Sequence, residues 1–379
     1  MNIDELRKQI NEIDAELVKA FDARMKVALE IGKYKKENGL PVFDPARERA
    51  VLDKQTSAVA EDMSMYVKLL YNTLFDLSRS YQQRYMTQGS QISSRIAKSI
   101  EGTSKNFPKK AVVACQGVEG AYSQQACDKL FEMPNIVYFK RFEGVFQAIE
   151  NGMCAYGVLP IENSSHGSVT EVYDLMRKHR FHIVRSVKLK INHRLLAKPG
   201  VELKDIREIF SHEQAIGQCS EFLKSLKDVK VTVCENTAAA ARMVSCSERN
   251  DIAAIAAPAC AQLYGLSVVK SDISNSDSNY TRFICIARQL EIYPGANKMS
   301  LMLTVQHKPG ALYSMIAKFS ALGLNLTKLE SRPLAGTDFE FMFYFDFDAS
   351  VYDEAALQLL SELDAGPEDF TYLGSYSEI

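Results

Sequence analysis

Apolar residues recur every three or four positions through the start of the chain, which is the signature of one apolar stripe along a helix. The stripe is formed by Ile3, Leu6, Ile10, Ile13, Leu17 and Phe21. We predict one helix over 4–37, which Asn38-Gly39 ends and Pro41 prevents from continuing. At about 1.5 Å per residue this helix is about 50 Å long, more than a small domain buries by itself. We expect a helix from a second copy of the chain to pack against this stripe.

Two further helices complete an all-α domain over residues 1–88. Asp44 as N-cap and Pro45 in the first turn begin the second helix, and the third runs from about Met65 to Met86. Residues 89–110 are rich in Ser, Gly and Lys. This composition predicts a linker, with room for a helical turn over 92–100.

The hydrophobic period changes at residue 111. Short apolar runs alternate with helical patterns and cover 111–115, 156–161, 183–189, 206–210, 251–257 and 283–287. This alternation predicts an open, mostly parallel sheet with helices on both faces, in which ligands lie beyond the carboxyl ends of strands. Residues 111–288 have room for two such lobes with a cleft between them.

The last eighty residues follow the order β-α-β-β-α-β, which predicts an α+β, ferredoxin-like sandwich over 298–379. The strands are expected at 300–305, 324–331, 339–347 and 370–375, with helices at 310–321 and 352–363. The chain is therefore expected to be a multi-domain protein.

Composition narrows the class of protein. A net charge of -2 and a pI near 6.4 argue against nucleic-acid binding, and no run approaches the ~18 apolar residues of a membrane span. The acidic N-terminus is unlike a signal peptide. Eight cysteines lie at least twelve positions apart, so neither a zinc site nor a dithiol is indicated. We interpret them as reduced core residues of a cytoplasmic protein.

Charged residues of the helical domain indicate a site for a small dianion. Arg24 falls on the apolar stripe, where a buried guanidinium is costly unless an anion meets it. For most of the helical Lys and Arg residues, the alternative is a solvated face. Arg7 lies about 25 Å from Arg24 along one helix, so only the Arg7 of an antiparallel partner chain approaches it. Ser78 and Gln82 share one helix face and offer neutral hydrogen bonds.

These residues resemble the all-helical chorismate mutase family over 1–88. The motifs are 6–10, Arg24, 32–35, 41–48 and Ser78 with Gln82. The resemblance implies that the partner's Arg7, Arg24 and Arg47 hold the carboxylates of chorismate. Lys35 and Gln82 would face its ether oxygen, and Glu48 its ring hydroxyl. A pericyclic rearrangement needs a compact conformer and donors on that oxygen, without a nucleophile. Asp44 is either an N-cap or a substrate contact.

Polar segments in the α/β region exclude several common sites. The loop over 116–123 lacks the G-x-G-x-x-G spacing of a dinucleotide site. His212-Glu213 begins an H-E-x-x-H pattern that Ile216 breaks, and Ser211 lies outside a G-x-S-x-G elbow. His166 is either a catalytic acid or an exposed loop residue.

Four segments in order, at 117–123, 160–164, 211–219 and 279–283, resemble the prephenate dehydratase family across about 111–288. The family usually has Pro where Glu213 stands, and we expect only a changed helix start. The resemblance implies a two-lobed, periplasmic-binding-like fold in which Thr281 is essential. Prephenate loses carbon dioxide and hydroxide, so Thr281 would donate to the departing hydroxyl. Its expected neighbours are Asn163, Ser211, Gln218 and Asn279. If the strand already runs at Thr281, alternation points Arg282 to the opposite face, and its role is then either structural or part of the site.

The C-terminal segments 307–313 and 330–333 resemble the amino-acid-binding regulatory (ACT-type) domain. The resemblance implies a phenylalanine pocket between two chains. Its residues would be Gly310, Ala311, Leu312, Glu330, Ser331, Arg332 and Pro333.

From end to end the chain resembles the bifunctional chorismate mutase–prephenate dehydratase family. We expect conversion of chorismate through prephenate to phenylpyruvate without a metal or cofactor, feedback inhibition by phenylalanine, and a homodimer or higher homo-oligomer. One alternative is a dehydratase that prefers arogenate, which a comparison of the two substrates distinguishes. Another is a non-catalytic amino-acid sensor, which would bind phenylalanine without turnover.

Overall fold

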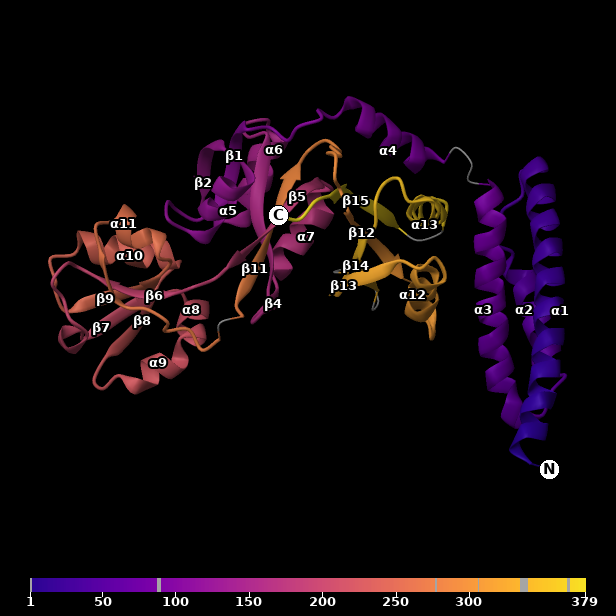
Figure 1. The fold of residues 1–379 in the computed structure, drawn as a ribbon. Helices are drawn as coiled ribbons and strands as arrows, with labels where there is room; N and C mark the ends of the chain where they lie inside the picture. The colour runs from indigo at the N-terminus through magenta and orange to yellow at the C-terminus, as the bar shows by residue number, and fades with distance from the viewer. Residues whose placement is uncertain (1, 87–89, 277, 306, 335–339, 367–368) are drawn as a thin grey trace.

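The computed structural model describes residues 2–86, 90–276, 278–305, 307–334, 340–366 and 369–379. Three bodies follow one another in space (Figure 1). The N-terminal helices lie at one end, the two-lobed α/β region lies at the other, and the C-terminal α+β domain lies between them. In the described ranges, no helix combines the length and the hydrophobicity that a transmembrane span needs.

The N-terminal domain contains the three predicted helices. They are α1 (Ile3–Glu37), α2 (Pro45–Thr56) and α3 (Glu61–Met86). Asn2 and Glu5 form a capping box at the start of α1, and Asp44 caps α2 by accepting a hydrogen bond from the Arg47 backbone amide at 3.0 Å. Because Glu61 and Asp62 provide an acidic first turn, α3 begins four residues before the predicted start.

Helix α1 leaves its apolar stripe open to solvent within one chain. Only Ala28 and Gly32 are buried along it. The six stripe residues are between 36% and 59% exposed. Helix α3 adds further exposed apolar side chains, at Met63, Met65, Tyr66, Leu69 and Leu70. A continuous exposed apolar surface of this kind marks an interaction face.

The predicted linker contains a helix that is longer than the helical turn allowed for over 92–100. Helix α4 (Gln91–Gly102) begins at the N-cap Ser90, and its Ile92 and Ile96 are buried in the core of the C-terminal domain. Ile92, Ile96 and Ile100 are spaced four apart, so one helix face is apolar and packs as a helix rather than remaining a linker.

The first α/β lobe holds the sheet order β2-β1-β3-β11-β5, with the short β4 paired to β3. Its strands are β1 (Lys110–Gln116), β2 (Met133–Phe139), β3 (Tyr156–Asn163), β4 (Gly167–Ser168), β5 (His182–Lys190) and β11 (Tyr280–Ala287). Its helices are α5 (Tyr122–Leu130), α6 (Phe142–Glu150) and α7 (Thr170–His179).

The second lobe holds the sheet order β10-β6-β9-β7-β8. Its strands are β6 (Arg194–Ala197), β7 (Glu208–Ser211), β8 (Lys230–Val233), β9 (Ile252–Ala256) and β10 (Ser267–Lys270). Its helices are α8 (Glu213–Gln218), α9 (Ser220–Ser225), α10 (Thr237–Cys246), α11 (Ala259–Leu263) and the 3-10 turn η1 (Leu203–Asp205).

The expectation of mostly parallel sheets is wrong, because both sheets are mixed. The chain leaves the first lobe after β5 and returns through β11, which therefore lies antiparallel between β3 and β5. In the second lobe β6 is antiparallel to β9 and β10. The segments that cross between the lobes bring their residues to the junction of the two sheets. They are 191–193, 271–276 and 278–279.

The C-terminal domain has the predicted order of elements. These are β12 (Lys298–Val305), α12 (Ala311–Ala321), β13 (Asn325–Pro333), β14 (Phe341–Asp348), α13 (Glu354–Asp364) and β15 (Phe370–Tyr376). The strands form one antiparallel sheet in the order β13-β14-β12-β15. The first residue of the predicted strand at 339–347 lies outside the described residues.

The C-terminal sheet is buried on both faces. One face shares a core with α4, α12 and α13. The other face shares a core with the first α/β lobe, where Met342, Tyr344 and Leu373 pack with Ile161 and Ile284. On its outer side the domain also contacts α3, through a hydrogen bond in which Ser80 Oγ donates to Glu362 Oε1 at 2.7 Å.

Candidate active sites

Three polar side chains meet where β11 enters the first sheet. Thr281 pairs with Asn163 across the β3–β11 ladder, and Asn163 Nδ2 donates to Thr281 Oγ1 at 2.9 Å and to Asn279 Oδ1 at 2.8 Å. Thr281 and Asn279 are 9% and 2% exposed. Because Asn163 occupies a lone pair of the threonine oxygen, the hydroxyl proton is left to be donated elsewhere. This arrangement brings together three of the residues predicted from the sequence.

A chain of hydrogen bonds extends from this group to the second lobe. Asn163 Oδ1 accepts from the backbone amide of His166 at 3.0 Å, and His166 Nδ1 accepts from Gln218 Nε2 at 3.1 Å. Gln218 Oε1 accepts from His193 Nε2 at 2.8 Å. Burial lowers the pKa of His193, so its neutral form is favoured. Residues of both lobes and of the first crossing segment therefore form one polar network.

The first residue of α5 fixes the first crossing segment. Tyr122 donates its hydroxyl to the Asn192 carbonyl at 2.7 Å and accepts from the Asn192 amide at 3.0 Å. Burial raises the pKa of Tyr122, which keeps this hydroxyl protonated. Gly117 and Gly120 have positive φ values of 113° and 89°, which a residue with a Cβ rarely adopts.

Ser211 does not join this group. It is fully buried in the second lobe, where its hydroxyl donates to the Ile255 carbonyl at 2.7 Å. His212 caps the following helix by accepting from the Gln214 amide at 3.3 Å, and α8 begins at Glu213. The departure from Pro at this position is thus compatible with a helix start.

In the mutase-like domain, Arg24 reaches from α1 to α3. Its Nη1 donates to Ser78 Oγ and, at 3.3 Å, to the Leu74 carbonyl. Gln82, one turn beyond Ser78, is 7% exposed, and its Oε1 is buried without a hydrogen-bond partner in the part of the chain that the structure describes. Gly32 lies against Gln82, where an added Cβ would come within 3.1 Å of its side chain. Small size at residue 32 therefore lets the two helices approach here.

Within one chain, the other residues of the predicted mutase site either lie apart from Arg24 or already have a polar partner. Lys35 Nζ donates to the Val42 carbonyl at 2.6 Å, and Glu48 forms an ion pair with Arg79. Asp44 is the N-cap already described. Arg47 is exposed, and the Arg7 side chain is 71% exposed beside Asp4. The long helix α1 keeps Arg7 far from Arg24, so one chain does not assemble the whole predicted set.

The predicted regulatory residues lie on α12 and on the edge strand β13. Gly310 caps α12 with a positive φ of 83° and is followed by Ala311 and Leu312. Glu330 accepts from Ser168 Oγ at 2.5 Å. Arg332 forms a two-pronged ion pair with Asp174 at 2.9 and 3.2 Å, while Ser331 and Pro333 are exposed.

Three polar residues at these sites escaped the sequence reasoning. His193 lies in an irregular crossing segment, and Arg79 sits among other helical charges, so neither shows a periodic signal. Tyr122 lies within the 117–123 segment, but its role depends on the distant Asn192. Of the described residues, no group of three His, Cys, Asp or Glu side chains is placed to hold a metal ion.

Comparison with known proteins identifies both halves. Family models match at residues 113–291 for prephenate dehydratase and at residues 6–83 for chorismate mutase type II. The chain is 31% identical to the bifunctional chorismate mutase/prephenate dehydratase of Escherichia coli K12, covering 98% of this chain and 95% of that protein.

Two further relatives match about 70% of the chain. Arogenate dehydratase/prephenate dehydratase 2 of Arabidopsis thaliana is 40% identical, over 70% of this chain and 72% of its own. A crystal structure of prephenate dehydratase from Arthrobacter aurescens in complex with L-Phe is 29% identical, with a TM-score of 0.64 over 70% of this chain and 89% of that one. The chain belongs to the bifunctional chorismate mutase/prephenate dehydratase family and carries both enzyme activities.

Proposed function

We propose that Thr281 is the residue that donates to the departing hydroxyl of prephenate in the dehydratase reaction. The supporting observation is the hydrogen bond from Asn163 Nδ2, which leaves the threonine proton available. Loss of the carboxylate as carbon dioxide supplies the electron pair that expels hydroxide and makes the ring aromatic. The protein therefore has to orient the substrate and protonate or hydrogen-bond the leaving oxygen.

The substrate carboxylates are bound at the junction of the two lobes. Asn279 Nδ2 is a buried donor there, without a hydrogen-bond partner in the described part of the chain. An unpartnered buried donor is costly, and a bound carboxylate oxygen would satisfy it. Gln218 joins the lobes by bridging His166 and His193, so substrate binding and closure of the lobes are linked in this proposal.

The mutase site is proposed to form between two chains. Arg24, Ser78 and Gln82 lie together in one chain, while the exposed stripe of α1 would pack against its copy in an antiparallel dimer. The partner's Arg7 would complete the set that binds the two carboxylates of chorismate, together with Arg47. Lys35 and Gln82 would donate to the ether oxygen, which gains negative charge in the transition state. Glu48 would bind the ring hydroxyl.

The C-terminal domain is proposed to be a ferredoxin-like ACT domain that binds phenylalanine as a feedback inhibitor. The loop at 310–312 and the strand residues 330–333 would form the pocket with a second chain. Its support is the β-α-β-β-α-β order and the edge position of β13. The Arthrobacter aurescens relative contains L-Phe.

Supplying chorismate to the whole chain tests the two reactions together. The unaltered protein should release phenylpyruvate, whereas Thr281→Ala should accumulate prephenate at an unchanged mutase rate. Thr281→Ser, which keeps the hydroxyl, is the matched control and should retain dehydratase activity. Release of phenylpyruvate by Thr281→Ala at the normal rate would exclude the assignment of Thr281.

Arogenate is the second candidate substrate, because the 40%-identical plant relative is named for both dehydratase activities. Arogenate carries an amino group where prephenate carries a keto group. Measuring kcat/KM for both substrates on the same preparation decides between them. The proposal requires the larger value for prephenate.

A further inference from the structure

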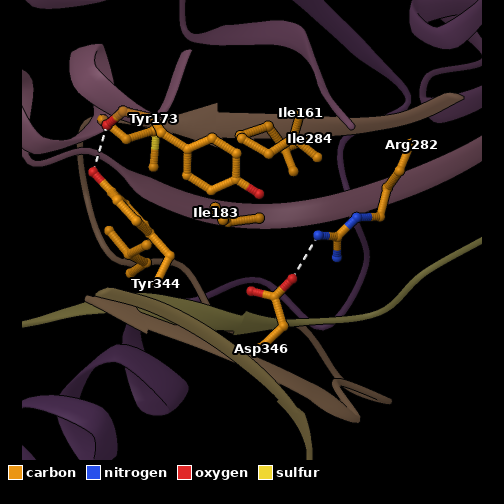
Figure 2. A pocket seen from close by; sticks show the side chains of 9 residues that line it. Ile161, Tyr173, Ile183, Arg282, Ile284, Tyr344 and Asp346 are labelled. Carbon is orange, nitrogen blue, oxygen red and sulfur yellow. Dashed lines mark hydrogen bonds and ion pairs between the residues drawn. The ribbon is translucent and has the colours of Figure 1, made fainter. Parts of the chain in front are cut away.

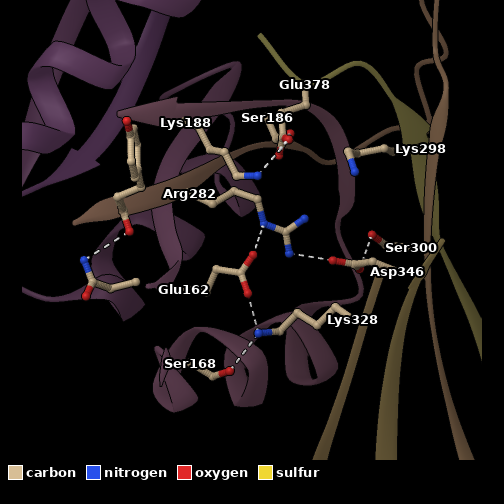
Figure 3. Close-up of polar contacts among 12 residues, drawn as sticks. Glu162, Ser168, Ser186, Lys188, Arg282, Lys298, Ser300, Lys328, Asp346 and Glu378 are labelled. Atoms are coloured by element: carbon tan, nitrogen blue, oxygen red, sulfur yellow. Dashed lines mark hydrogen bonds and ion pairs between the residues drawn. The ribbon is translucent and has the colours of Figure 1, made fainter. Parts of the chain in front are cut away.

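Arg282 lies next to Thr281 but faces the other side of the sheet, toward the C-terminal domain. Its side chain is 6% exposed. Its Nε lies 2.6 Å from Glu162 Oε1, and its Nη2 lies 2.5 Å from Asp346 Oδ2 (Figure 3). One guanidinium therefore joins a carboxylate of the dehydratase lobe to a carboxylate of the C-terminal sheet.

The two dehydratase residues of this contact, Arg282 and Glu162, each lie next to a residue of the site. Arg282 follows Thr281 on β11, and Glu162 precedes Asn163 on β3. The two are cross-strand partners, and the register shifts directly after them, between Arg282 and Phe283. Such an irregularity interrupts the regular ladder, so side-chain contacts contribute more to fixing the strand here.

The contact continues toward the predicted phenylalanine-binding residues. Glu162 Oε2 lies 2.5 Å from Lys328 Nζ, which donates to Ser168 Oγ at 2.9 Å. Ser168 in turn donates to Glu330 Oε2 at 2.5 Å. A continuous polar route therefore runs from Glu330 to the residue beside Thr281.

The C-terminal sheet also holds Asp346 in place. Ser300 Oγ donates to Asp346 Oδ1 at 2.6 Å and lies 2.7 Å from the Tyr376 hydroxyl. Figure 2 shows Arg282 and Asp346 at the edge of the apolar contact between the sheet and the lobe, with Tyr173 and Tyr344 nearby. Burial alone would lower the pKa of Arg282, but the charges of Asp346 and Glu162 outweigh it and raise the pKa. Arg282 therefore remains charged.

We propose that Arg282 is a positioning residue for Thr281, and that the C-terminal domain controls the dehydratase through the Asp346–Arg282–Glu162 contact. A shift of the C-terminal sheet would move Arg282 with Asp346 and displace the adjacent Thr281 from Asn163. This inference rests on the proposed role of Thr281 and on phenylalanine binding at the C-terminal domain.

The first test weakens the ion pair between the domains, Arg282–Asp346, and leaves the ion pair within the lobe, Arg282–Glu162. In the full chain, Asp346→Asn removes the charge with little change of shape. We expect kcat for prephenate within about twofold, phenylalanine affinity by calorimetry within about threefold, and half-inhibition at a phenylalanine concentration at least about tenfold higher. Normal inhibition, or loss of phenylalanine binding together with inhibition, would overturn the proposed control.

The second test addresses positioning without phenylalanine. Arg282→Lys keeps the charge, but an ammonium does not reproduce the fork that reaches two carboxylates. We expect kcat to fall at least about tenfold with KM within about threefold, because the loss lies in Thr281 placement rather than substrate binding. Normal kcat in this variant would overturn the positioning role. Mutase activity, measured on the same sample, should be unchanged.

Tyr344→Phe is the matched control. Tyr344 also lies on β14 and donates its hydroxyl across the same domain contact, to the Tyr173 carbonyl at 2.6 Å. It should leave kcat and phenylalanine inhibition unchanged, and uncoupling equal to that of Asp346→Asn would contradict a specific route through Arg282. An unaltered chain that does not bind phenylalanine would instead exclude the proposed regulation, while Arg282→Lys would still decide the positioning role.

Discussion

The helical N-terminal domain and the first α/β lobe place their sites in opposite environments. Along α1 only Ala28 and Gly32 are buried, whereas seven of the eight residues of β11 are buried. Thr281 and Asn163 meet within one chain, but Arg7 and Arg24 are held apart by a straight helix. The proposed dehydratase site is thus largely formed by folding, while the proposed mutase site would depend on assembly.

This difference follows from the secondary structure that supplies the residues. Neighbouring strands bring residues that are distant in sequence within 3 Å of one another, as at Asn163 and Thr281. A single long helix keeps its residues about 1.5 Å apart per position along its axis. A helical domain therefore completes a compact anion site only by adding another helix, which a second chain would supply in the proposed dimer.

The largest difference between mutase and dehydratase activity should come from a substitution that disrupts the proposed dimer. Leu17→Asp places a charge on the exposed stripe of α1 and should prevent the helices from packing against each other. Mutase activity should fall by at least about 100-fold, with dehydratase kcat within about twofold, as measured on each substrate separately. Lys19→Asp, on the opposite helix face, is the control. Equal loss of both activities would contradict the comparison.

Removing the donor to Thr281 should affect only the dehydratase. Asn163→Asp keeps the size of the side chain, but its carboxylate does not donate to Thr281 Oγ1 and repels a dianionic substrate. We expect dehydratase kcat/KM to fall by about 100-fold, at the lower end of the range for general acid–base catalysis, with the mutase rate unchanged. An unchanged kcat/KM would show that the hydrogen bond seen here has no part in the reaction.

The buried His182 makes the stability of the α/β region depend on pH. Burial, then the charge of Arg95, lowers the pKa of His182 from 6.5 to about 4. As the pH falls through 6.5, the unfolded chain gains a proton that the folded chain does not accept until near pH 4, so stability is lost. From pH 7 to pH 5 the loss is about 2 kcal/mol.

Chemical unfolding followed as a function of pH measures this loss. The unfolding transition of the α/β and C-terminal domains should shift to lower denaturant between pH 7 and pH 5, and His182→Gln should flatten that dependence. An identical pH dependence in His182→Gln would assign the loss to other groups.

The smallest effect concerns the cap of α2. Asp44→Ala removes the acceptor for the Arg47 amide and should cost about 1 kcal/mol of helical-domain stability. Asp44→Asn keeps the cap and should retain stability. If Asp44→Asn weakens chorismate binding in steady-state kinetics while stability is retained, Asp44 contacts the substrate as well.

Much of the architecture was predictable because its signals are local. The stripe of α1, the Asp44-Pro45 start of α2 and the C-terminal β-α-β-β-α-β order each appear in consecutive residues. The family motifs also predict Asn163, Asn279 and Thr281, which the structure places in contact. The face of Arg282 followed from strand alternation.

The remaining features depend on contacts between distant segments. Helix α4 looks like a linker because residues 89–110 as a whole are rich in Ser, Gly and Lys, and only the C-terminal core explains why Ile92 and Ile96 are buried. The antiparallel placement of β11 results from the return of the chain from the second lobe. His193 becomes recognisable as part of a site only through Gln218, which belongs to the other lobe.

Complementation between Arg7→Ala and Arg24→Ala tests the central comparison most directly. Each variant alone should lack mutase activity and keep dehydratase activity. After unfolding and refolding of an equal mixture, half of the dimers should be mixed, each with one intact mutase site. Mutase activity should then recover to about a quarter of the unaltered level, with dehydratase activity the same before and after mixing. Refolded mixtures that contain mixed dimers but recover no mutase activity would contradict a mutase site shared between chains.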